Sequence, residues 1–466
     1  MIDYYLAIDI GASGGRHILG HMEGDRLILE EVYRFENHMD EKDGSLTWDT
    51  ERLFKEILEG MKVCKRIGKT PHSLGIDTWG VDYALLDAEG KLLDRVYAYR
   101  DHRTDPTDTE LENIISADTL YEHTGIQKQK FNTVYQLFND KKIRPKVYES
   151  AKHMLLLPDY FVFMLTGNIS SEYTNATTTG LVNANSCDWD NEIIDALGIR
   201  KELLSKIVRP GTLARGLRKD IAQIVGYDTR VIKIASHDTA SAVAAVPAQS
   251  ETVFISSGTW SLLGTERKKC DCSKEAQNEN FTNEGGVEQR YRFLKNIMGM
   301  WMIQSLRHEF DDKYGYEEIA RLAEERFKDC PDDAFDKVID VNNSRFLSPI
   351  SMREAIDEVC LESGIEPPHD IAGYALLIYR SLAACYKKTI DKLEEITKTE
   401  YETIHIVGGG SKAAFLNGLL QKATNKRVCV GPAEATAVGN LFVQIVADGV
   451  CENITQARKN IKIEES

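Results

Sequence analysis

Residues 5–20 read Tyr-Leu-Ala-Ile-Asp-Ile-Gly-Ala-Ser-Gly-Gly-Arg-His-Ile-Leu-Gly, and this stretch indicates the fold. Residues 5–10 are an apolar, β-prone run, residues 11–15 a turn of small residues, and residues 17–19 a second strand. A third strand at residues 27–29 completes a predicted antiparallel meander. In a Rossmann or P-loop site, the glycine loop opens a helix whose N-terminus holds phosphate. Neither of those sites is therefore expected here.

The next segments alternate between helix and strand. A helix is predicted after the N-cap pair Asp49-Thr50, because apolar residues recur at helical spacing from Leu53 to Cys64. It ends near residues 68–70, Gly-Lys-Thr, but Val63 stands where a P-loop requires its first glycine. Strands are predicted on both sides of residues 76–82. A later strand, residues 231–235, stops at Ser-His-Asp before a helix of small residues.

The strand and turn pattern then recurs in the second half. Residues 253–264, Val-Phe-Ile-Ser-Ser-Gly-Thr-Trp-Ser-Leu-Leu-Gly, repeat the arrangement of residues 6–20, with Gly258 aligned on Gly11. A second repeat pairs the strand and turn of residues 76–80 with those of residues 404–410. The repeats predict an α/β protein of two similar domains, residues 1–246 and 247–466, with a cleft between them.

Composition limits the class and the partners. The chain has 466 residues, 42% of them hydrophobic and 28% charged, as in ordinary globular proteins. Its formal net charge of −16 argues against nucleic acid as a partner. The nine cysteines show no C-x-x-C spacing, which favours free thiols in a cytoplasmic protein over zinc or disulfides. The most apolar stretch, residues 154–165, is interrupted by Pro158 and predicts a buried helix pair, with no membrane partner.

Three small-residue turns are candidates for nucleotide binding. Asp9 lies at a strand end beside the turn of residues 11–15, where its carboxylate suits a hydrated Mg²⁺ while the turn contacts phosphate. Residues 256–259, Ser-Ser-Gly-Thr, offer hydroxyl and N–H groups to other phosphates. Three consecutive glycines at residues 408–410 let the backbone lie flat against a nucleotide. Plain glycine hairpins, and for the last a tight strand-to-helix turn, are the structural alternatives.

Asp238 is the candidate catalytic base. Phosphoryl transfer to a sugar hydroxyl requires a carboxylate within hydrogen-bond reach of that hydroxyl, and the adjacent His237 can donate to the sugar. The alternative is a helix N-cap aspartate beside a core histidine. Trp79 and Trp301 could stack on a sugar face or belong to the core.

Taken together, the motifs resemble those of the FGGY carbohydrate kinases, over nearly the whole chain, and are most similar to the kinases of L-rhamnulose. The matching segments are residues 9–16, 75–82, 236–242, 256–261, 283–286, 294–299 and 431–440. The resemblance implies the ribonuclease H-like, two-domain fold of sugar kinases, actin and the Hsp70 ATPase. It also implies ATP with Mg²⁺, transfer of the γ-phosphoryl group to O1 of L-rhamnulose, and a monomer or homodimer.

The resemblance also assigns roles to residues. Asp238 matches the catalytic base, and the N-terminal domain would be mainly sugar-binding while the C-terminal domain is mainly nucleotide-binding. The sugar contacts implied are Gly80, His237, Thr239 and Asn296. The nucleotide contacts implied are Ala12, Ser13, Gly14, Gly15, Arg16, Thr259, Gln304, Gly408, Gly409 and Gly410. Gly14 replaces the usual second serine of the first turn, and Lys412-Ala413 replaces a Gln-Asn pair near the adenine.

Other functions remain open at this point. A nucleotide-gated scaffold of the actin or Hsp70 type would share the phosphate turns but would not need a carboxylate base with polar sugar contacts. A sugar-responsive repressor would carry a basic helix-turn-helix module, whereas this chain enters its first strand at once. Within the kinases, a xylulokinase or fuculokinase is the main alternative.

Overall fold

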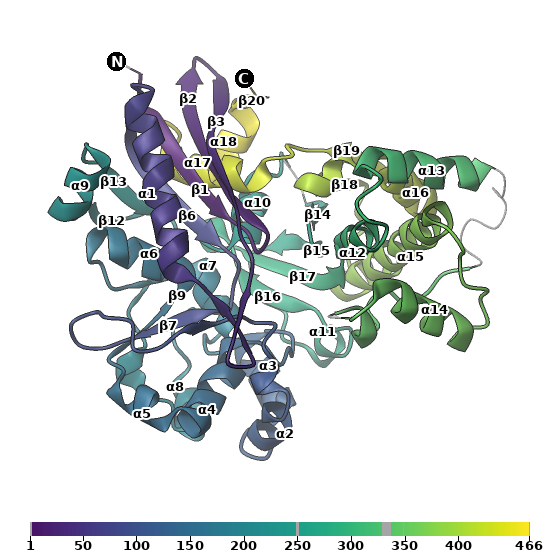
Figure 1. The fold of residues 1–466 in the computed structure, drawn as a ribbon, viewed down its shortest axis with the longest axis horizontal. Coiled ribbons are helices and arrows are strands. Elements are labelled where there is room, and N and C mark those ends of the chain that lie inside the picture. The colour runs from purple at the N-terminus through teal and green to yellow at the C-terminus, as the bar shows by residue number, and fades with distance from the viewer. Residues whose placement is uncertain (1, 248–250, 329–336, 348, 466) are drawn as a thin grey trace. The chain divides into compact units, whose positions relative to one another are not determined.

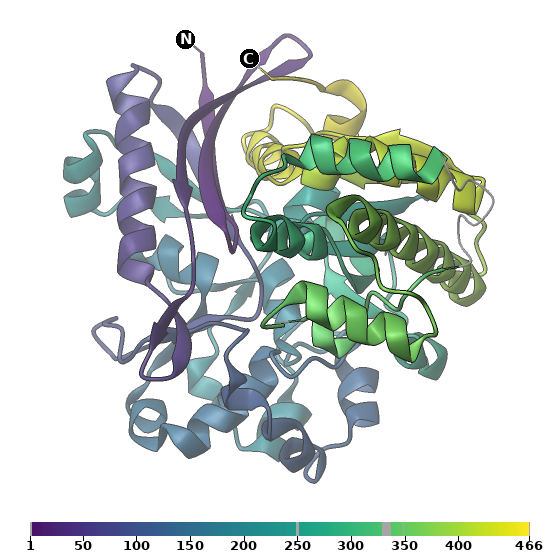
Figure 2. The same cartoon turned by 45° about the vertical axis from the view of Figure 1, so that its right-hand side comes forward.

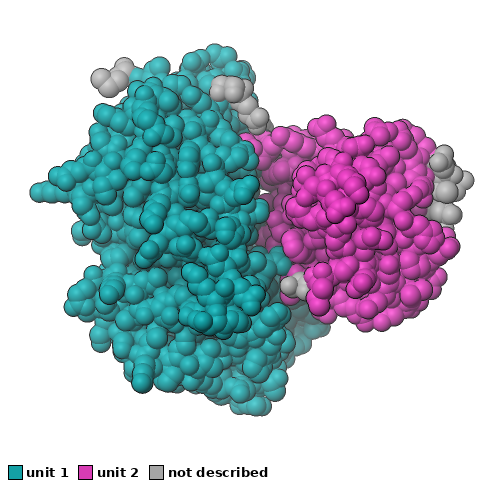
Figure 3. Space-filling model, in the orientation of Figure 1, with its two compact units in different colours: residues 1–249, 266–293, 435–466 teal, residues 250–265, 294–434 magenta. Residues whose placement is uncertain are grey.

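The computed structural model describes residues 2–247, 251–328, 337–347 and 349–465, which form an α/β protein (Figure 1). The chain divides into two compact units, coloured in Figure 3: unit 1 comprises residues 1–249, 266–293 and 435–466, and unit 2 comprises residues 250–265 and 294–434. Residues 248–250, beside the predicted domain boundary, lie outside the described residues. The prediction placed residues 247–466 in one domain, whereas residues 266–293 and 435–466 of that range belong to unit 1.

Unit 1 is built on a seven-stranded sheet that contains the predicted meander. β1 pairs antiparallel with β2, β2 pairs antiparallel with β3, and β1 also pairs in parallel with β6. The meander predicted from residues 5–29 is therefore confirmed. In spatial order the strands are β12 (Thr212–Gly216), β13 (Arg230–Lys233), β6 (Pro71–Thr78), β1 (Tyr4–Ile10), β2 (Gly14–Glu23), β3 (Arg26–Glu36) and β20 (Lys462–Glu465).

Helices cover both faces of this sheet (Figures 1 and 2). α1 (Thr50–Arg66) and α6 (Leu157–Thr166) pack on one face, and α10 (Asp238–Ala244) and α17 (Ala435–Ala447) on the other. As predicted, Asp49 caps α1, and its Oδ1 accepts a hydrogen bond from the backbone N–H of Arg52 at 2.9 Å. The apolar stripe of α1 is buried against the sheet.

The helix α17 explains why a late segment of the chain belongs to unit 1. A Cβ at Gly439 would lie 1.8 Å from the carbonyl oxygen of Ser241 in α10, so only glycine allows this close helix crossing. Buried polar side chains of α17 also bond to the strands beneath, since Gln444 Nε2 donates to the Leu6 carbonyl at 3.0 Å. The C-terminal segment therefore completes the core of unit 1.

A second sheet, of six strands, repeats the first in its strand order. β14 pairs antiparallel with β15 and in parallel with β18, as β1 does with β2 and β6. Each hairpin turn is closed by a hydrogen bond from its glycine, from Gly11 N–H to Gly14 O and from Gly258 N–H to Trp260 O, both at 2.8 Å. The duplicated domain predicted from the sequence is confirmed. The strands in order are β16 (Thr282–Gly285), β17 (Tyr291–Met298), β15 (Trp260–Arg267), β14 (Val253–Ser257), β18 (Thr403–Val407) and β19 (Arg427–Val430).

The remaining elements divide between the units. The helices of unit 2, green in Figure 2, are α12 (Trp301–Glu309), α13 (Tyr316–Lys328), α14 (Met352–Glu362), α15 (Ile371–Thr397) and α16 (Ala414–Thr424). Unit 1 also contains α2 (Thr107–Glu112), α3 (Ala117–Thr124), α4 (Thr133–Ile143), α5 (Pro145–Ser150), α7 (Tyr173–Ala176), α8 (Asn191–Leu197), α9 (Lys219–Val225), α11 (Lys274–Asn278) and α18 (Ile454–Asn460). Its short strands are β4 (Asp40–Lys42), β5 (Ser45–Trp48), β7 (Tyr83–Leu86), β8 (Val96–Tyr97), β9 (His153–Leu156), β10 (Ser171–Glu172) and β11 (Ile207–Val208).

The prediction of a buried helix pair at residues 154–165 is wrong for its first part and confirmed for its second. Its first part is the strand β9, which pairs antiparallel with β7, and only its second part is the helix α6. Leu156 has an extended backbone, and Pro158 in the first turn of α6 fixes where the helix begins. Throughout the described ranges, no helix combines the length and the apolar character needed to span a membrane.

Candidate active site

The first of the predicted phosphate turns joins β1 to β2 in unit 1. Strand register places Asp9 opposite Arg16 on one side and opposite Asp77 on the other. Paired residues of neighbouring strands point to the same face of a sheet, so these three side chains form a row. Within the row, Arg16 Nε lies 3.3 Å from Asp9 Oδ2. The structure therefore brings the predicted metal residue and a predicted nucleotide contact together.

The backbone of this turn is held from one side. Asn37 donates through Nδ2 to the Gly11 carbonyl at 2.9 Å and through its N–H to the Ser13 carbonyl at 3.2 Å. A Cβ at Gly15 would lie 2.2 Å from the ring of Phe35, which explains the glycine at this position. Ser13 itself is exposed, and Ala12 and Gly14 are half-buried. The turn is thus fixed in position with its tip accessible to a ligand.

Asp77 is a buried carboxylate that sequence reasoning did not assign. Burial, and next the charge of Asp9, raise its pKa well above the usual range, and Asp238 adds to the effect. Asn440 Nδ2 donates to Asp77 Oδ2 at 2.6 Å, while Asp77 Oδ1 has no hydrogen-bond partner among the described residues. Asp77 stood in the matching segment of residues 75–82, so the motif contained the signal.

These carboxylates fit a hydrated divalent cation. A cation near Asp9 and Asp77 would relieve the repulsion that raises the pKa of Asp77 and would give its Oδ1 a partner through water. No cluster of three or more His, Cys, Asp or Glu side chains in the described ranges could hold a metal directly. Mg²⁺ keeps several of its waters in proteins, so one or two nearby carboxylates suit it.

Residues 79–82 follow β6 and form a strained, buried segment. Val81 has φ = +69°, a left-handed conformation that β-branched residues rarely adopt. Its N–H bonds to Thr178 Oγ1 at 3.2 Å, and its carbonyl accepts from Thr133 Oγ1 at 2.7 Å. A Cβ at Gly80 would meet the Thr178 side chain at 3.0 Å. The surroundings of Gly80 therefore fix the backbone of this predicted sugar contact.

The two tryptophans considered for sugar stacking differ. Trp79 is buried, lies against Trp48 with 4.2 Å between ring centroids, and donates to Asp82 Oδ2 at 2.8 Å. Trp79 is thus a core residue. Trp301 is half-buried at the start of α12, and its Nε1 donates to the Phe346 carbonyl at 3.1 Å.

Asp238 is the first residue of α10, and His237 is the N-cap position. Thr239 N–H donates to Asp238 Oδ1 at 2.5 Å, Thr239 Oγ1 lies 3.1 Å from the same oxygen, and His237 Nε2 lies 3.3 Å from it. Within the described residues, the hydrogen bonds and the ion pair of this carboxylate are all made by Oδ1, which leaves Oδ2 for a ligand. Its side chain is 35% exposed, so it can be reached. The alternative that Asp238 is the helix N-cap is wrong, because His237 occupies that position and Asp238 is the first residue of the helix.

A buried ion pair that the sequence did not reveal lies beside His237. Arg292 Nη2 lies 3.1 Å from His237 Nδ1 and 3.1 Å from Glu284 Oε2. Burial opposes ionisation of Glu284, but the charge of Arg292 holds its pKa below the usual range. Glu284 lay in the matching segment of residues 283–286, whereas nothing in the sequence distinguished Arg292.

Glu172 fixes the residue that precedes His237. Its carboxylate accepts from Ser236 N–H at 3.0 Å and Ser236 Oγ at 2.8 Å, and from Thr174 N–H at 2.9 Å. Thr174 Oγ1 in turn lies 3.3 Å from His237 N, and Asn175 Nδ2 donates to the Trp79 carbonyl at 3.4 Å. This network joins the segments that carry Gly80 and Asp238.

In unit 2, the glycine triplet packs against the turn of residues 256–259. Gly408 has φ = +83°, and a Cβ added to it would lie 3.0 Å from the Ser257 carbonyl oxygen. A Cβ added to Gly410 would lie 1.9 Å from Ser257 Oγ. Gly409 faces open space. Two of the three glycines are thus required by packing, and the third is available to a ligand.

Other predicted contacts also belong to unit 2. The Thr259 carbonyl accepts from Trp301 N–H at 3.2 Å, which places Gln304 one helical turn into α12. Asn296 is half-buried in β17, and its Oδ1 has no hydrogen-bond partner among the residues described. An unpaired buried acceptor of this kind suits a ligand donor. Lys412 is exposed at the end of the glycine turn.

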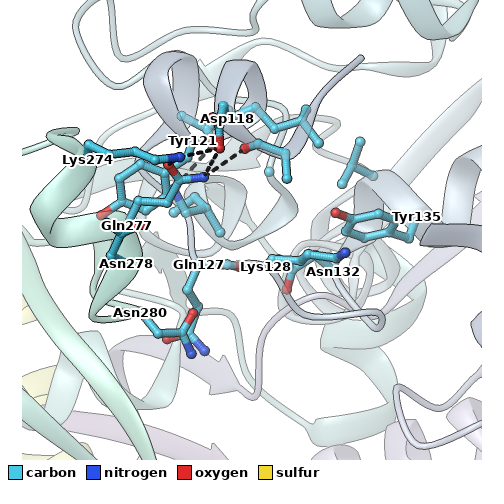
Figure 4. Close-up of a pocket in the computed structure, with 16 residues that line it drawn as sticks. Asp118, Tyr121, Gln127, Lys128, Asn132, Tyr135, Lys274, Gln277, Asn278 and Asn280 are labelled. Carbon is cyan, nitrogen blue, oxygen red and sulfur yellow. Dashed lines mark hydrogen bonds and ion pairs between the residues drawn. The ribbon is translucent and has the colours of Figure 1, made fainter. Parts of the chain in front are cut away.

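A separate cavity of about 250 Å³ lies in unit 1 and is lined by none of the predicted site residues (Figure 4). At one side, Asp118 accepts from Lys274 Nζ at 2.6 Å and Gln277 Nε2 at 3.0 Å. Gln127 is buried in its wall, and neither amide atom has a partner among the described residues. This cavity is distinct from the residues assigned to catalysis.

Comparisons with known proteins agree with these features. The model of the N-terminal domain of the FGGY family of carbohydrate kinases matches residues 4–245, and that of the C-terminal domain matches residues 253–447. The chain is 44% identical to the rhamnulokinase of Halalkalibacterium halodurans, over 99% of this chain and 97% of that protein. It is 43% identical to the rhamnulokinase of Enterococcus faecalis, over 98% and 92%.

Solved structures share the fold. A ligand-bound xylulose kinase from Lactobacillus acidophilus superposes with a TM-score of 0.79 at 17% identity, covering 99% of this chain and 92% of that one. Plasmodium falciparum glycerol kinase with ADP gives a TM-score of 0.77 at 14% identity, covering 99% and 95%. With both family models matched in order along the chain, the protein belongs to the FGGY family of carbohydrate kinases.

Proposed function

We propose that the protein transfers the γ-phosphoryl group of ATP to O1 of L-rhamnulose. The near full-length identity of 38–44% to proteins named rhamnulokinase supports this substrate. The observation that best supports the chemistry is the position of Asp238. Asp238 is the first residue of α10, its carboxylate is accessible, and the groups that contact the carboxylate lie at Oδ1.

In the proposed reaction, Asp238 Oδ2 accepts the proton of the O1 hydroxyl as that oxygen bonds to the γ-phosphorus. The bond from the γ-phosphorus to the β,γ-bridging oxygen breaks, and ADP leaves with that electron pair. A reaction with a loose transition state depends mainly on the positions of the reacting groups. A base such as Asp238, which Thr239 and His237 hold in place, is suited to it.

The other sugar contacts are proposed by position. Gly80 presents backbone beside the strained Val81, and His237, Thr239 and Asn296 offer polar groups. Within unit 2, the Thr259 turn, Gln304 and Gly408 to Gly410 would contact the nucleotide. Within unit 1, the turn from Ala12 to Arg16 would contact its phosphates.

Mg²⁺ would be held through water by Asp9, with Asp77 beside it, as the raised pKa of Asp77 supports. When bound, the ion would neutralise phosphate charge. The protein's part is to keep carboxylates at this position on β1 and β6.

A coupled assay of ADP release with a panel of ketoses tests the proposal. L-rhamnulose should give the highest kcat/KM against L-fuculose, D-xylulose and L-xylulose, and the product should carry phosphate on O1. A higher kcat/KM with another ketose would replace the substrate but keep the kinase. No turnover with any sugar would refute the proposed function.

A further inference from the structure

His237 lies between the proposed base and a buried pair of opposite charges, all within unit 1. His237 Nε2 lies 3.3 Å from Asp238 Oδ1, and His237 Nδ1 lies 3.1 Å from Arg292 Nη2. Arg292 is 0% exposed and Glu284 5% exposed, so neither charge is screened by water. Arg292 is also fixed at its other end, because its Nε donates to the Gly285 carbonyl at 2.9 Å.

The protonation of His237 follows from the chemistry of its neighbours. A guanidinium group only donates hydrogen bonds, so Nδ1 must accept from Arg292 Nη2 and carry no proton. Glu284 Oε2 lies 3.3 Å from the same nitrogen but forms no hydrogen bond with it or with any other described residue. The single proton of the neutral ring is therefore on Nε2, which faces Asp238.

We propose that Arg292 is a positioning residue that holds His237 in the tautomer with its proton on Nε2. In this tautomer the protonated Nε2 of His237 lies 3.3 Å from Asp238 Oδ1 as an electrostatic contact, and Thr239 N–H donates a hydrogen bond to the same oxygen. The carboxylate is then fixed with Oδ2 turned to the acceptor hydroxyl. Glu284 balances the charge of Arg292 in the protein interior at 3.1 Å. As a statement about catalysis, this inference rests on the proposed function.

Removal of Arg292 should reverse the tautomer. In Arg292→Met, the nearest polar atom to Nδ1 is the acceptor Glu284 Oε2, so the proton should move to Nδ1. Nε2 would then lose its proton or the ring would become an imidazolium. Either change alters the donor that fixes Asp238, and kcat should fall about 10–100-fold, as when an orienting partner of a functional histidine is lost. KM for ATP should stay unchanged.

The direct test is ¹⁵N NMR of the full-length protein labelled at its 11 histidines, with His237→Gln used to assign the signal. The wild type should show a protonated Nε2 and an unprotonated Nδ1, and Arg292→Met should show a protonated Nδ1. Arg292→Lys keeps a cationic donor and should recover part of kcat. Arg290→Met is the matched control. Among the described residues, the Arg290 side chain forms a hydrogen bond only with Thr455 at the surface, so its loss should leave both readouts unchanged.

The spectrum of the wild type needs no substrate and no altered residue, so it separates this inference from the proposed function and from misfolding of variants. A wild-type His237 with its proton on Nδ1, or on both nitrogens, would overturn the assignment. A folded Arg292→Met with wild-type kcat would overturn the positioning role, whatever its tautomer. A failure to phosphorylate L-rhamnulose would refute the proposed substrate and leave the tautomer result standing.

Discussion

Asn440 and Asp77, 363 positions apart in the sequence, are joined by a hydrogen bond of 2.6 Å from Nδ2 to Oδ2. The bond connects α17 to the end of β6, where Asp77 lies opposite Asp9. Asn440 also donates to the Gly75 carbonyl at 3.2 Å and accepts from Gln444 Nε2 at 2.7 Å. The last long helix of unit 1 thus supports the carboxylates proposed for the metal.

Replacement of this amide should destabilise the protein more at high pH than at low pH. Asn440→Leu removes the donor that lowers the pKa of Asp77, which burial and Asp9 already raise. A carboxyl group whose pKa is raised in the folded protein contributes its full stabilisation below the unfolded pKa of 3.8. This stabilisation is lost as the pH rises through the pKa of the folded state. The variant should lose about 1–3 kcal/mol of unfolding free energy, with the larger loss at pH 8 than at pH 5, measured by urea unfolding.

Asn417→Leu is the matched control for that experiment. Asn417 is a buried amide in α16 whose Nδ2 donates to the neutral Ser411 carbonyl at 2.9 Å. Its loss should cost a similar free energy at both pH values. Equal losses at pH 5 and pH 8 in Asn440→Leu would contradict the link to Asp77.

The sequence was sufficient to predict the two hairpins that begin the repeated sheets, but not every element between them. The runs at residues 5–10 and 253–257 are apolar, β-prone and followed by glycine turns, so local pattern identified both hairpins. Residues 154–157 are four apolar residues in a row, and so short a run does not distinguish a strand from a helix. Pairing of β9 with the distant β7 decided the outcome.

Some residues of the candidate site could likewise be identified from local sequence, and others could not. Asp9 and Asp238 stand at strand ends, where local sequence shows a carboxylate beside a turn. Arg292 lies inside a strand pattern and is buried only because Glu284 and His237, from other segments, surround it. Contacts of that kind depend on strand register over long separations, which one sequence does not display.

Asp82 should titrate within the folded protein. Burial raises its pKa to about 6, although Trp48 Nε1 at 2.7 Å and Trp79 Nε1 at 2.8 Å both donate to Oδ2. Because the folded pKa lies above the unfolded 3.8, its contribution to stability is complete below about pH 4 and lost by about pH 6. The loss should be at most about 3 kcal/mol. Tryptophan fluorescence should change with a midpoint near pH 6.

Asp82→Asn is the control for this titration. The amide keeps an oxygen for the two indole N–H groups but carries no titrating proton. Its fluorescence should be flat between pH 4 and pH 8, and its stability should fall less across that window than that of the wild type. A wild-type midpoint below pH 4.5 would show that the indole donors outweigh burial.

Neighbouring glycines of the triplet should respond differently to a methyl group. Gly410→Ala would place Cβ 1.9 Å from Ser257 Oγ, so it should destabilise unit 2 by about 1–3 kcal/mol. Gly409→Ala meets no atom within 4 Å and should melt as the wild type does. If ATP lies on this turn as proposed, Gly409→Ala should raise KM for ATP without changing KM for the sugar. An unchanged KM for ATP would remove Gly409 from the nucleotide site.

The last prediction separates catalysis from helix stability at Asp238. Asp238→Asn keeps the size of the side chain and an oxygen for the Thr239 N–H, but it removes the charge that accepts the hydroxyl proton. The variant should lose at most about 1 kcal/mol of unfolding free energy, because only the helix N-terminus is affected. Its kcat should fall by about 10²–10⁴, with KM for the sugar largely kept.

Asp220→Asn provides the comparison, since Asp220 is an aspartate in the first turn of α9 in the same unit. That variant should show a similar small change in melting temperature and a wild-type kcat. Thermal melting and steady-state kinetics on the two variants therefore measure the helix effect and the chemical effect separately. If Asp238→Asn is stably folded and its kcat is close to that of the wild type, another group must take the hydroxyl proton.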